Sequence, residues 1–409
     1  MTPRLLIIVL AVLAVSAGRL SAAESAAAPG FSRTRQEEGH WWLIDPQGRP
    51  FMSNCVAIVL SDQDYIQGTK ISPYADTVKA NYVDSASAPK LHTPDVSDPE
   101  FEKLCRARAI KLCAPAKDDT QLLGWFTDNE LRWGADELLV VFLNLPASAP
   151  GRAAAFALLR SRYPDVAAFN AFWRTSFSSW AEAEKIARPE TPPDATRPVL
   201  AAQNIRMERT AAIGAVRAYI ADYDAFAALH AGRYFQIASD AIRTTDPHHL
   251  ILGCRFAIIP PAPVIAAAVP HIDVISINCY DPRGPAHALD AYAPFPRPVI
   301  IGKFSYRGRD SGLPNTKGAS PIVETQEQRT QGFEDYVTAG LRRPNLVGYH
   351  WFEHADETKE GRFDGEGSNY GLLNFHDEHC ASLIARMASV NAQADAIHKS
   401  LPLAVQAKS

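Results

Sequence analysis

The sequence predicts an α/β fold built around a parallel barrel. Three apolar runs, residues 249–256, 272–280 and 298–306, follow one another with helical or crossover segments between them. Strands separated in this way form a parallel sheet that is covered on both faces. The predicted strand ends carry polar and aromatic side chains, which favours a barrel over a doubly wound sheet. The chain also lacks a glycine-rich phosphate turn, which weakens the nucleotide-binding alternative further.

The composition is consistent with a large buried core. The chain has 409 residues, of which 47% are hydrophobic, so one barrel or two to three smaller domains would fit. A formal net charge of −4 with both signs interspersed gives no indication of nucleic acid or an anionic membrane surface. We expect no cofactor and no metal site. The acidic stretch 356–366 leaves calcium open, although a solvated turn is the simpler interpretation.

The N-terminal segment predicts export. Arg4 precedes an apolar run that ends near Ala17, and the small residues Ser21-Ala22-Ala23 suit a signal peptidase. We therefore expect a signal peptide over residues 1–23, a flexible lead over 24–38, and a secreted or periplasmic location. An uncleaved anchor is the alternative. Six cysteines without metal-ligand spacing are expected to be buried structural thiols.

Residues 39–409 are expected to form a single barrel domain that opens with a hairpin. Residues 41–44 form the first hairpin strand and 45–48 the turn, and the run 51–60 continues into the first barrel strand. Asp98-Pro99 predicts a helix start, because Asp is a good N-cap and Pro suits the first helical position. Further elements are expected in the order of the chain: helices within 151–185 and 207–243, a helix over 325–342, and a closing strand over 346–353.

The stretch 123–133, LGWFTDNELRW, organises the predicted site. An apolar run suited to a buried strand stops at Asp128-Asn129-Glu130. Acidic and amide groups at a strand end suit the C-terminal rim of a barrel, where catalytic groups gather. Glu130 is therefore the candidate proton donor. The alternative is a helix N-terminus with a solvated Asp-Asn-Glu.

The mature chain resembles the agarase-type glycoside hydrolases of the large barrel clan A, and more distantly the β-galactosidases of that clan. The matching motifs run in the order of the family across most of residues 39–375. They are WWLIDPQGRPFMSN, DPEFE, GWFTDNELRWG, RSRYPDVAAFNAFWRTSFSSW, DPHHLILGCRF, DVISINCY, PVIIGKFSYRGRDSGLPNTKG and GYHWFEHADETKEGRFDGEGSNYGLLN.

The resemblance implies a (β/α)8 TIM barrel that cleaves a galactan-type polysaccharide with retention. Glu130 would be the acid/base, and Asn129 would hold a sugar hydroxyl. Tyr280 would bond the nucleophile, and Trp351 would form an aromatic floor under the sugar. The expected substrate-binding set is Asn129, Trp133, Asn278, Tyr280, His350, Trp351, Asp364, Glu366 and Asn369.

One residue departs from the family pattern. The family has a Gly-Glu-Phe sequence with the glutamate nucleophile at the end of the seventh strand, whereas this chain has Gly302-Lys303-Phe304. Retaining hydrolysis needs two carboxyl groups about 5–5.5 Å apart. An ammonium group cannot attack the anomeric carbon, and a cation near Glu130 would favour its ionised form. We therefore expect an ion pair at Lys303 rather than a nucleophile.

Other arrangements remain open. Glu353, Asp310, Asp356 or Glu366 could supply the second carboxylate, either as a displaced nucleophile or as part of an inverting pair about 6.5–9.5 Å apart. A Schiff-base role for Lys303 is a further alternative. The chain also has only about 60 residues between 60 and 121 for two βα units of about 30 residues each. The second unit is therefore expected to be missing or degenerate. A non-catalytic carbohydrate-binding pseudoenzyme is the main alternative to a hydrolase.

Overall fold

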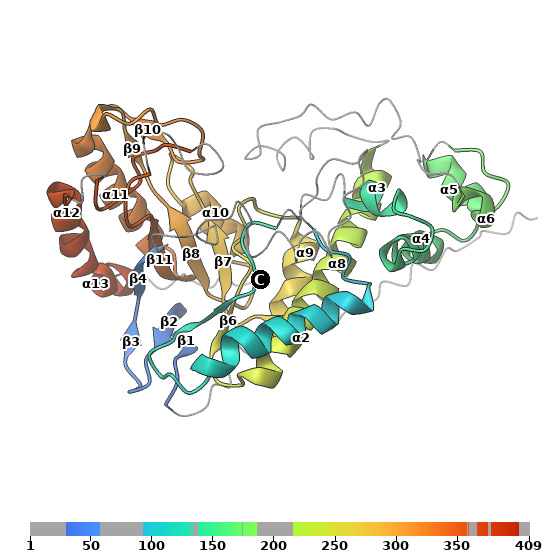
Figure 1. Ribbon diagram of the computed structural model, residues 1–409, viewed down its shortest axis with the longest axis horizontal. Helices are drawn as coiled ribbons and strands as arrows, with labels where there is room; N and C mark the ends of the chain where they lie inside the picture. The colour runs from blue at the N-terminus through green and yellow to red at the C-terminus, as the bar shows by residue number, and fades with distance from the viewer. Residues whose placement is uncertain are drawn as a thin grey trace, which may run out of the picture.

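Parallel strands form the centre of the computed structural model of this chain (Figure 1). A four-stranded sheet has the order β4-β11-β8-β7, and a bridge between Phe256 and Ile277 links it to the pair β5-β6. The described residues are 30–57, 93–131, 133, 138–173, 175–185, 216–357, 359, 366–374 and 378–400. Those that form the parallel strands are β4 (Ser53–Ala57), β5 (Gly124–Phe126), β6 (Leu250–Gly253), β7 (Ile275–Asn278), β8 (Val299–Phe304) and β11 (Leu346–Phe352).

The mixed α/β class agrees with the expectation, but the strands do not close into a barrel within the described part of the chain. The row runs from β5 through β6, β7, β8 and β11 to β4, and neither β4 nor β5 has a partner strand on its outer side among these residues. Residues 58–92, where the second and third strands were expected, lie outside the described residues. The predicted loss of the second βα unit therefore stays a prediction.

Side chains on the two faces of the sheet enter two different cores. Leu250, Leu252 and Val274 pack in a small inner cluster, together with Ile300 and Val347. The intervening Ile251, Ile275 and Ile301 face the larger outer core that the helices cover. Successive strand residues point to opposite faces, so this alternation assigns each position to one core.

An antiparallel hairpin covers the inner cluster at the N-terminal ends of the strands (Figure 1). It consists of β1 (Arg33–Glu37), β2 (His40–Ile44) and β3 (Pro50–Phe51). Trp41 and Leu43 of β2 belong to the inner cluster, and the Trp41 N–H donates to the carbonyl of Pro344 at 2.8 Å. The β2–β3 hairpin was predicted. The strand β1 was not, since its polar sequence RTRQE had been assigned to the flexible lead.

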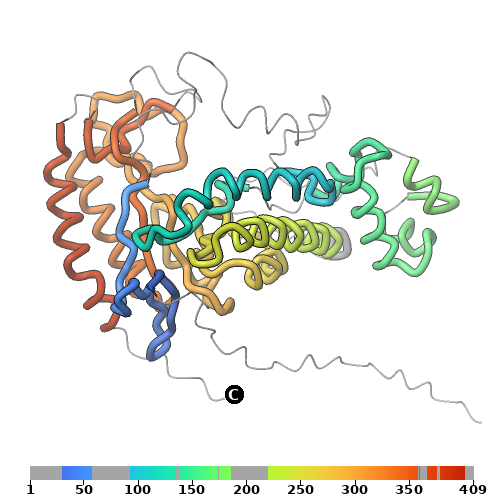
Figure 2. Tube along the Cα trace, turned by 60° about the horizontal axis from the view of Figure 1, so that its bottom comes forward, coloured from blue at the N-terminus to red at the C-terminus, as the bar shows by residue number. Residues whose placement is uncertain are grey.

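Helices cover the outer face and extend to one side. They are α2 (Pro99–Cys113), α3 (Leu138–Leu143), α4 (Pro150–Arg162), α5 (Val166–Trp173), α6 (Trp180–Ala183), α8 (Val216–Thr245), α9 (Ala262–Ala268), α10 (Ala286–Tyr292), α11 (Gln326–Leu341), α12 (Ala381–Asn391) and α13 (Ala394–Lys399). The two short strands β9 (Arg307–Gly308) and β10 (Ile322–Val323) pair with each other. Figure 2 shows α2 running alongside α8, with α4 to α6 projecting away from the sheet.

The predicted helix starts are confirmed at two places. Asp98 caps α2, because its Oδ1 accepts the N–H of Glu100 at 2.9 Å, and Pro99 opens the helix. Thr325 caps α11 through the N–H of Gln328 at 3.2 Å. These caps satisfy backbone donors that a helix leaves without an internal partner.

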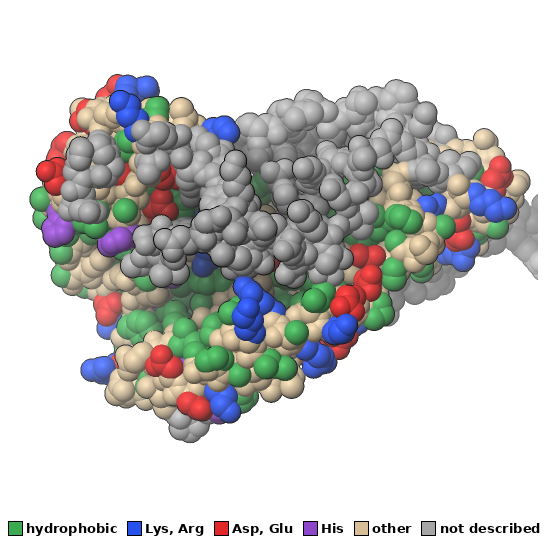
Figure 3. All heavy atoms as spheres, in the orientation of Figure 1, with side chains coloured by type: hydrophobic (Ala, Val, Ile, Leu, Met, Phe, Trp, Pro, Cys, Tyr) green, Lys and Arg blue, Asp and Glu red, His purple; other side chains and the backbone are tan. Residues whose placement is uncertain are grey.

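The surface carries charges of both signs. Figure 3 shows Lys and Arg side chains interspersed with Asp and Glu over the visible described face. No helix in the described ranges is long and apolar enough to cross a membrane. All six cysteines are free thiols, and Cys55 is exposed, so the expectation of uniformly buried thiols was wrong for that residue.

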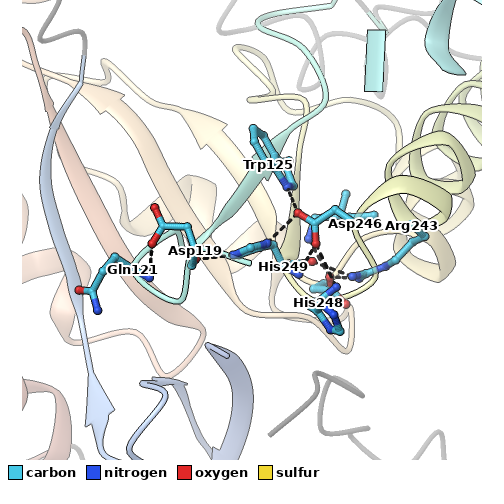
Figure 4. Close-up of polar contacts among 9 residues, drawn as sticks. Asp119, Gln121, Trp125, Arg243, Asp246, His248 and His249 are labelled. Atoms are coloured by element: carbon cyan, nitrogen blue, oxygen red, sulfur yellow. Dashed lines mark hydrogen bonds and ion pairs between the residues drawn. The ribbon is translucent and has the colours of Figure 1, made fainter. Parts of the chain in front are cut away.

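A dense polar network lies at the N-terminal end of β6 (Figure 4). Asp246 accepts hydrogen bonds at Oδ1 from the backbone N–H groups of His248 (3.1 Å) and His249 (3.2 Å). Its Oδ2 lies 2.7 Å from both the indole Nε1 of Trp125 and the Nδ1 of His249. The other ring nitrogen of His249 lies 2.8 Å from the carbonyl oxygen of Asp119. The network ties the segments before β5 and β6 together.

Candidate active site

The predicted site residues converge because their strands are parallel. The strands β5, β6, β7, β8 and β11 all run in one direction, so their carboxyl ends lie at one edge of the sheet. Catalytic and binding groups gather at this edge in parallel barrels. The side chains placed here are Asn129, Glu130, Arg255, Asn278, Tyr280, Lys303, His350, Phe352 and Glu353.

Asn278 joins the end of β7 to the Asn129-Glu130 pair. Its Nδ2 lies 2.7 Å from Oε1 of Glu130 and 3.3 Å from Oδ1 of Asn129. Asn278 itself is 3% exposed, so this amide fixes the Glu130 carboxylate from a rigid strand position. The sequence motif therefore does not form a solvated helix start.

Two residues at this edge have a backbone conformation that L-residues rarely adopt. Glu130 has φ +64° and Arg255 has φ +51°. The Glu130 N–H points at the turn that follows β6, 3.1 Å from the carbonyl of Cys254 and 3.3 Å from that of Arg255. Strained backbone of this kind clusters at functional sites, where the surrounding structure holds it in place.

Tyr280 lies among the carboxylates of the site. Burial first, and then the neighbouring Glu130 carboxylate, raises the pKa of the Tyr280 hydroxyl well above its ordinary value. The negative charges of Glu366 and Glu353 also raise the pKa of Tyr280. Tyr280 is therefore a neutral O–H donor at ordinary pH, which is the form that can donate to a carboxylate or a sugar oxygen.

Lys303 lies at the end of β8. It pairs in register with Asn278 on the adjacent strand, and its side chain is only 8% exposed. The Nζ atom lies 5.1 Å from the centre of the Phe352 ring. A buried cation thus stands on the strand beside Asn278, which holds Glu130.

His350 lies on β11 with its ring buried. Its Nε2 is 3.0 Å from Oγ of Ser53 on β4, and the residue is 8% exposed. Burial, followed by the charge of Arg255, lowers the pKa of His350 to about 4. The imidazole is therefore neutral at ordinary pH and acts as a hydrogen-bonding group between two strands.

Two tryptophans expected to bind substrate lie in the outer core instead. Trp351 is 1% exposed, and its Nε1 donates to the carbonyl of Tyr370 at 2.8 Å. Trp133 is 2% exposed, and its Nε1 lies 3.5 Å from Sγ of Cys254. Both rings are enclosed by side chains, which leaves no surface on which a sugar could stack.

Phe352 is the aromatic residue at the end of β11 that faces the site. Its ring centre lies 6.3 Å from that of Tyr280 in an edge-to-face arrangement, and Lys303 lies over its face. Because Trp351 points to the outer core, its neighbour Phe352 must point to the other face of the strand. Val347 enters the inner cluster but Tyr349 and Trp351 the outer core, so alternation breaks within β11, where the pairing register shifts, and could not have identified Phe352 from the sequence.

The loop after β11 contributes one group to the site and several to its own stability. The charge of Glu366 contributes to the raised pKa of Tyr280. Asn369 instead holds the loop, since its Nδ2 lies 3.0 Å from both carboxylate oxygens of Asp356 and its Oδ1 accepts the N–H of Gly308. Asp364 lies outside the described residues. The described residues contain no cluster of three or more metal-ligating side chains.

Comparison with known proteins gives the relatives of this chain. Beta-agarase B of Vibrio sp. (strain JT0107) is 28% identical over 316 residues, which are 74% of this chain and 30% of that protein. Beta-agarase A of the same organism is 29% identical over 308 residues, 69% of this chain and 28% of that protein. This chain is related to the agarase-type glycoside hydrolases. It matches less than a third of the length of these curated relatives.

Solved structures of agarases share the fold of this agarase relative. An exo-beta-agarase superposes with a TM-score of 0.73 at 21% identity, over 91% of this chain and 65% of that one. The agarase AgWH50C superposes with a TM-score of 0.70 at 22% identity, over 91% of this chain and 66% of that one. No family model matches the chain.

Proposed function

We propose that this agarase relative binds a galactan-type polysaccharide at the strand ends around Glu130 and Tyr280, and that Lys303 leaves it without the usual hydrolytic nucleophile. The observation that carries the proposal is the pair Asn278 and Lys303, which face each other in register on β7 and β8. The first holds Glu130 at 2.7 Å, as an acid/base would need. The second puts an ammonium group where the attacking carboxylate should be.

The rest of the site supports sugar binding. Tyr280, which is partly exposed, offers aromatic surface, and neutral Tyr280 and Asn129 offer hydrogen-bonding groups to hydroxyls. Pockets for small polar ligands combine such surfaces with a few fixed polar groups. Agarose is the substrate named for the relatives, so agarose oligosaccharides are the first ligands to test.

The decisive experiment compares the natural protein with Lys303→Glu and Lys303→Gln. Reducing-sugar release from agarose and binding of an agarose tetrasaccharide are measured for all three. We expect binding by the natural protein without release. We expect release from Lys303→Glu only, since Gln matches the shape of Glu but cannot attack carbon. Removing a nucleophile costs about 10⁶ in rate in another enzyme class. Absence of binding by all three folded proteins would reject a galactan function.

A second candidate is hydrolysis by the natural protein with Glu353 as the second carboxylate. Glu353 follows β11 and is 7% exposed. Its charge, like that of Glu130, helps to raise the pKa of Tyr280. Sugar release by the natural protein that is lost in Glu353→Gln would support this candidate. The anomeric configuration of the first product would then separate a retaining route from an inverting one.

Export remains part of the proposal. It rests on Arg4, the apolar run that follows it, and the small residues 21–23. Expression of the full chain in a bacterial host followed by N-terminal sequencing of the periplasmic fraction tests it. A mature N-terminus near residue 24 is expected, and an uncleaved chain in the membrane fraction would contradict it.

A further inference from the structure

Two buried polar atoms at the base of the site have no hydrogen-bond partner in the part of the chain that the structure describes. They are Oδ1 of Asn278, an acceptor, and Nε of Arg255, a donor. Buried polar groups in native proteins are nearly always paired, so each exception calls for an explanation such as a bound ligand group or water.

The orientation of the Asn278 amide follows from its partners. Its nitrogen faces the Glu130 carboxylate at 2.7 Å and Oδ1 of Asn129 at 3.3 Å. An ionised carboxylate and an amide oxygen only accept hydrogen bonds, so the amino group must point toward them. The Asn278 oxygen is therefore directed away from Glu130.

Gly302 marks the point where the two unpaired groups meet. A Cβ atom on Gly302 would lie 3.1 Å from Oδ1 of Asn278 and 3.3 Å from both Cγ and Cδ of Arg255. The Arg255 stem that carries Nε thus passes over the same spot on β8 that the Asn278 oxygen faces. The absence of a side chain at residue 302 lets both side chains pack closely against the backbone of β8.

The Arg255 guanidinium has a fixed plane. Its Cζ lies 3.9 Å above the centre of the Phe126 ring, a close cation–π arrangement. Its backbone is held as well, because the Arg255 N–H donates to Oγ of Ser276 at 2.8 Å. A planar group clamped at both ends presents its Nε–H in one direction.

We propose that Nε of Arg255 and Oδ1 of Asn278 together bind one free hydroxyl group of the sugar that lies next to Glu130. A hydroxyl accepts one hydrogen bond and donates another, so one hydroxyl can satisfy an unpaired donor and an unpaired acceptor whose side chains both approach Gly302. A hydrogen, an ether or a sulfate ester at that ring position would leave at least the Asn278 oxygen unpaired. The site therefore selects galactans that are unsubstituted at this hydroxyl. This inference rests on the proposed function, since it names a group on the same ligand.

The test is a set of calorimetric titrations with methyl β-galactoside and its 2-, 3-, 4- and 6-deoxy analogues. For the natural protein, one analogue is expected to bind about 10–100-fold more weakly than the parent, the effect of leaving a buried group unpaired. Arg255→Lys keeps the cation but removes Nε, so the penalty for that analogue should fall to about twofold. Arg283→Lys is the matched control, because Arg283 pairs with Asp281 at the surface with 74% of its side chain exposed. It should leave the pattern unchanged.

The outcomes separate this inference from the function it rests on. If neither the parent glycoside nor an agarose tetrasaccharide binds, the proposed function fails. If they bind but all four analogues bind alike, an ordered water fills the spot and the hydroxyl inference is wrong. A penalty that persists in Arg255→Lys also overturns it. Gly302→Ala is the second variant if Arg255→Lys does not fold, and it should abolish the same single penalty because its Cβ would crowd Oδ1 of Asn278 and the stem of Arg255.

Discussion

The two ends of the parallel strands use polar residues in opposite ways. At the hairpin end, the Asp246 carboxylate accepts four hydrogen bonds, two of them from His249. At the site end, Glu130 and Arg255 have left-handed backbone conformations. There, Oδ1 of Asn278 and Nε of Arg255 find no partner among the described residues.

This contrast indicates that polar groups stabilise the fold at the hairpin end, whereas those at the site end can bind a ligand. Satisfied networks at the N-terminal ends of barrel strands support the fold, whereas strained and unpaired groups at the carboxyl ends belong to binding and catalysis. Substitutions at the two ends should therefore differ in what they change. Stability should respond at the hairpin end and ligand binding at the site end.

The largest expected effect is that of Asp246→Ala at the hairpin end. The substitution leaves buried donors of Trp125 and His249 without their acceptor, which should lower the free energy of unfolding by about 3–5 kcal/mol. Urea unfolding measures this loss. Asp98→Ala, which removes only the α2 cap, is the control and should cost about 1 kcal/mol. An equal cost for the two variants would remove the distinction between the ends.

The next effect concerns pH and His350. Its folded pKa of about 4 lies below the ordinary value of about 6.5, so the unfolded chain binds the proton first as pH falls. Stability from His350 is complete above about pH 6.5 and is lost as pH drops toward 4. Between pH 7 and 5 the loss should be about 2 kcal/mol. His350→Gln should flatten the slope of unfolding free energy against pH in this window. An unchanged slope would show that the imidazole is not held neutral.

His230, in the helical core, also contributes to the pH dependence of the free energy of unfolding. Burial lowers the pKa of His230 to about 3, so part of the slope should persist in His350→Gln. A double variant with His230→Gln should reduce the slope further, and His398 and His271, whose pKa values burial also lowers, should account for the rest. Asp246 also makes the free energy of unfolding depend on pH, but at lower pH than the histidines. Burial works to raise its pKa, but hydrogen bonds from Trp125, His248 and His249 outweigh burial and lower it. This contribution is lost only as pH falls below about 4.

The smallest expected effect measures the strain at Glu130. At φ +64° a glycine is unstrained and an alanine is not. Glu130→Gly should therefore be more stable than Glu130→Ala by about 0.5–1 kcal/mol, after the greater freedom of glycine in the unfolded chain is counted. Both variants remove the carboxylate and should lose any sugar release equally. Equal stability of the two would mean that the backbone of Glu130 relaxes and holds no strain.

The sequence predicted the strand ends well but not the side on which each residue lies. Runs 249–256, 272–280, 298–306 and 346–353 contain β6, β7, β8 and β11, because buried parallel strands are continuous apolar runs. Glu130, Asn278 and Tyr280 meet there for the same reason. Trp351 and Phe352 are adjacent aromatics, and only strand pairing decides which one faces the site. The resemblance to the family did not resolve this one-residue choice.

Other features depended on contacts between distant segments. Trp133 packs against Tyr234 and Phe235 of α8 in the outer core. The local sequence around Trp133 does not predict this packing. Strand β1 is polar, and it becomes a strand because β2 offers it a partner. Asn369 was expected to contact sugar, but Asp356 and Gly308 take its hydrogen bonds. Each of these outcomes depends on tertiary structure rather than on local propensity.

The helix α13 has a consequence for the order in which the protein is made. His398 lies between the carbonyl of Trp41 in the hairpin (3.2 Å) and that of Leu341 at the end of α11 (2.9 Å). Trp41 and His398 are 357 positions apart, so the ribosome delivers the hairpin long before the residue that fastens it. During synthesis, Trp41 and Leu43 have no core partners until the strands β6, β8 and β11 have been made. The hairpin can therefore be fastened over the inner cluster only after residue 398 has been made.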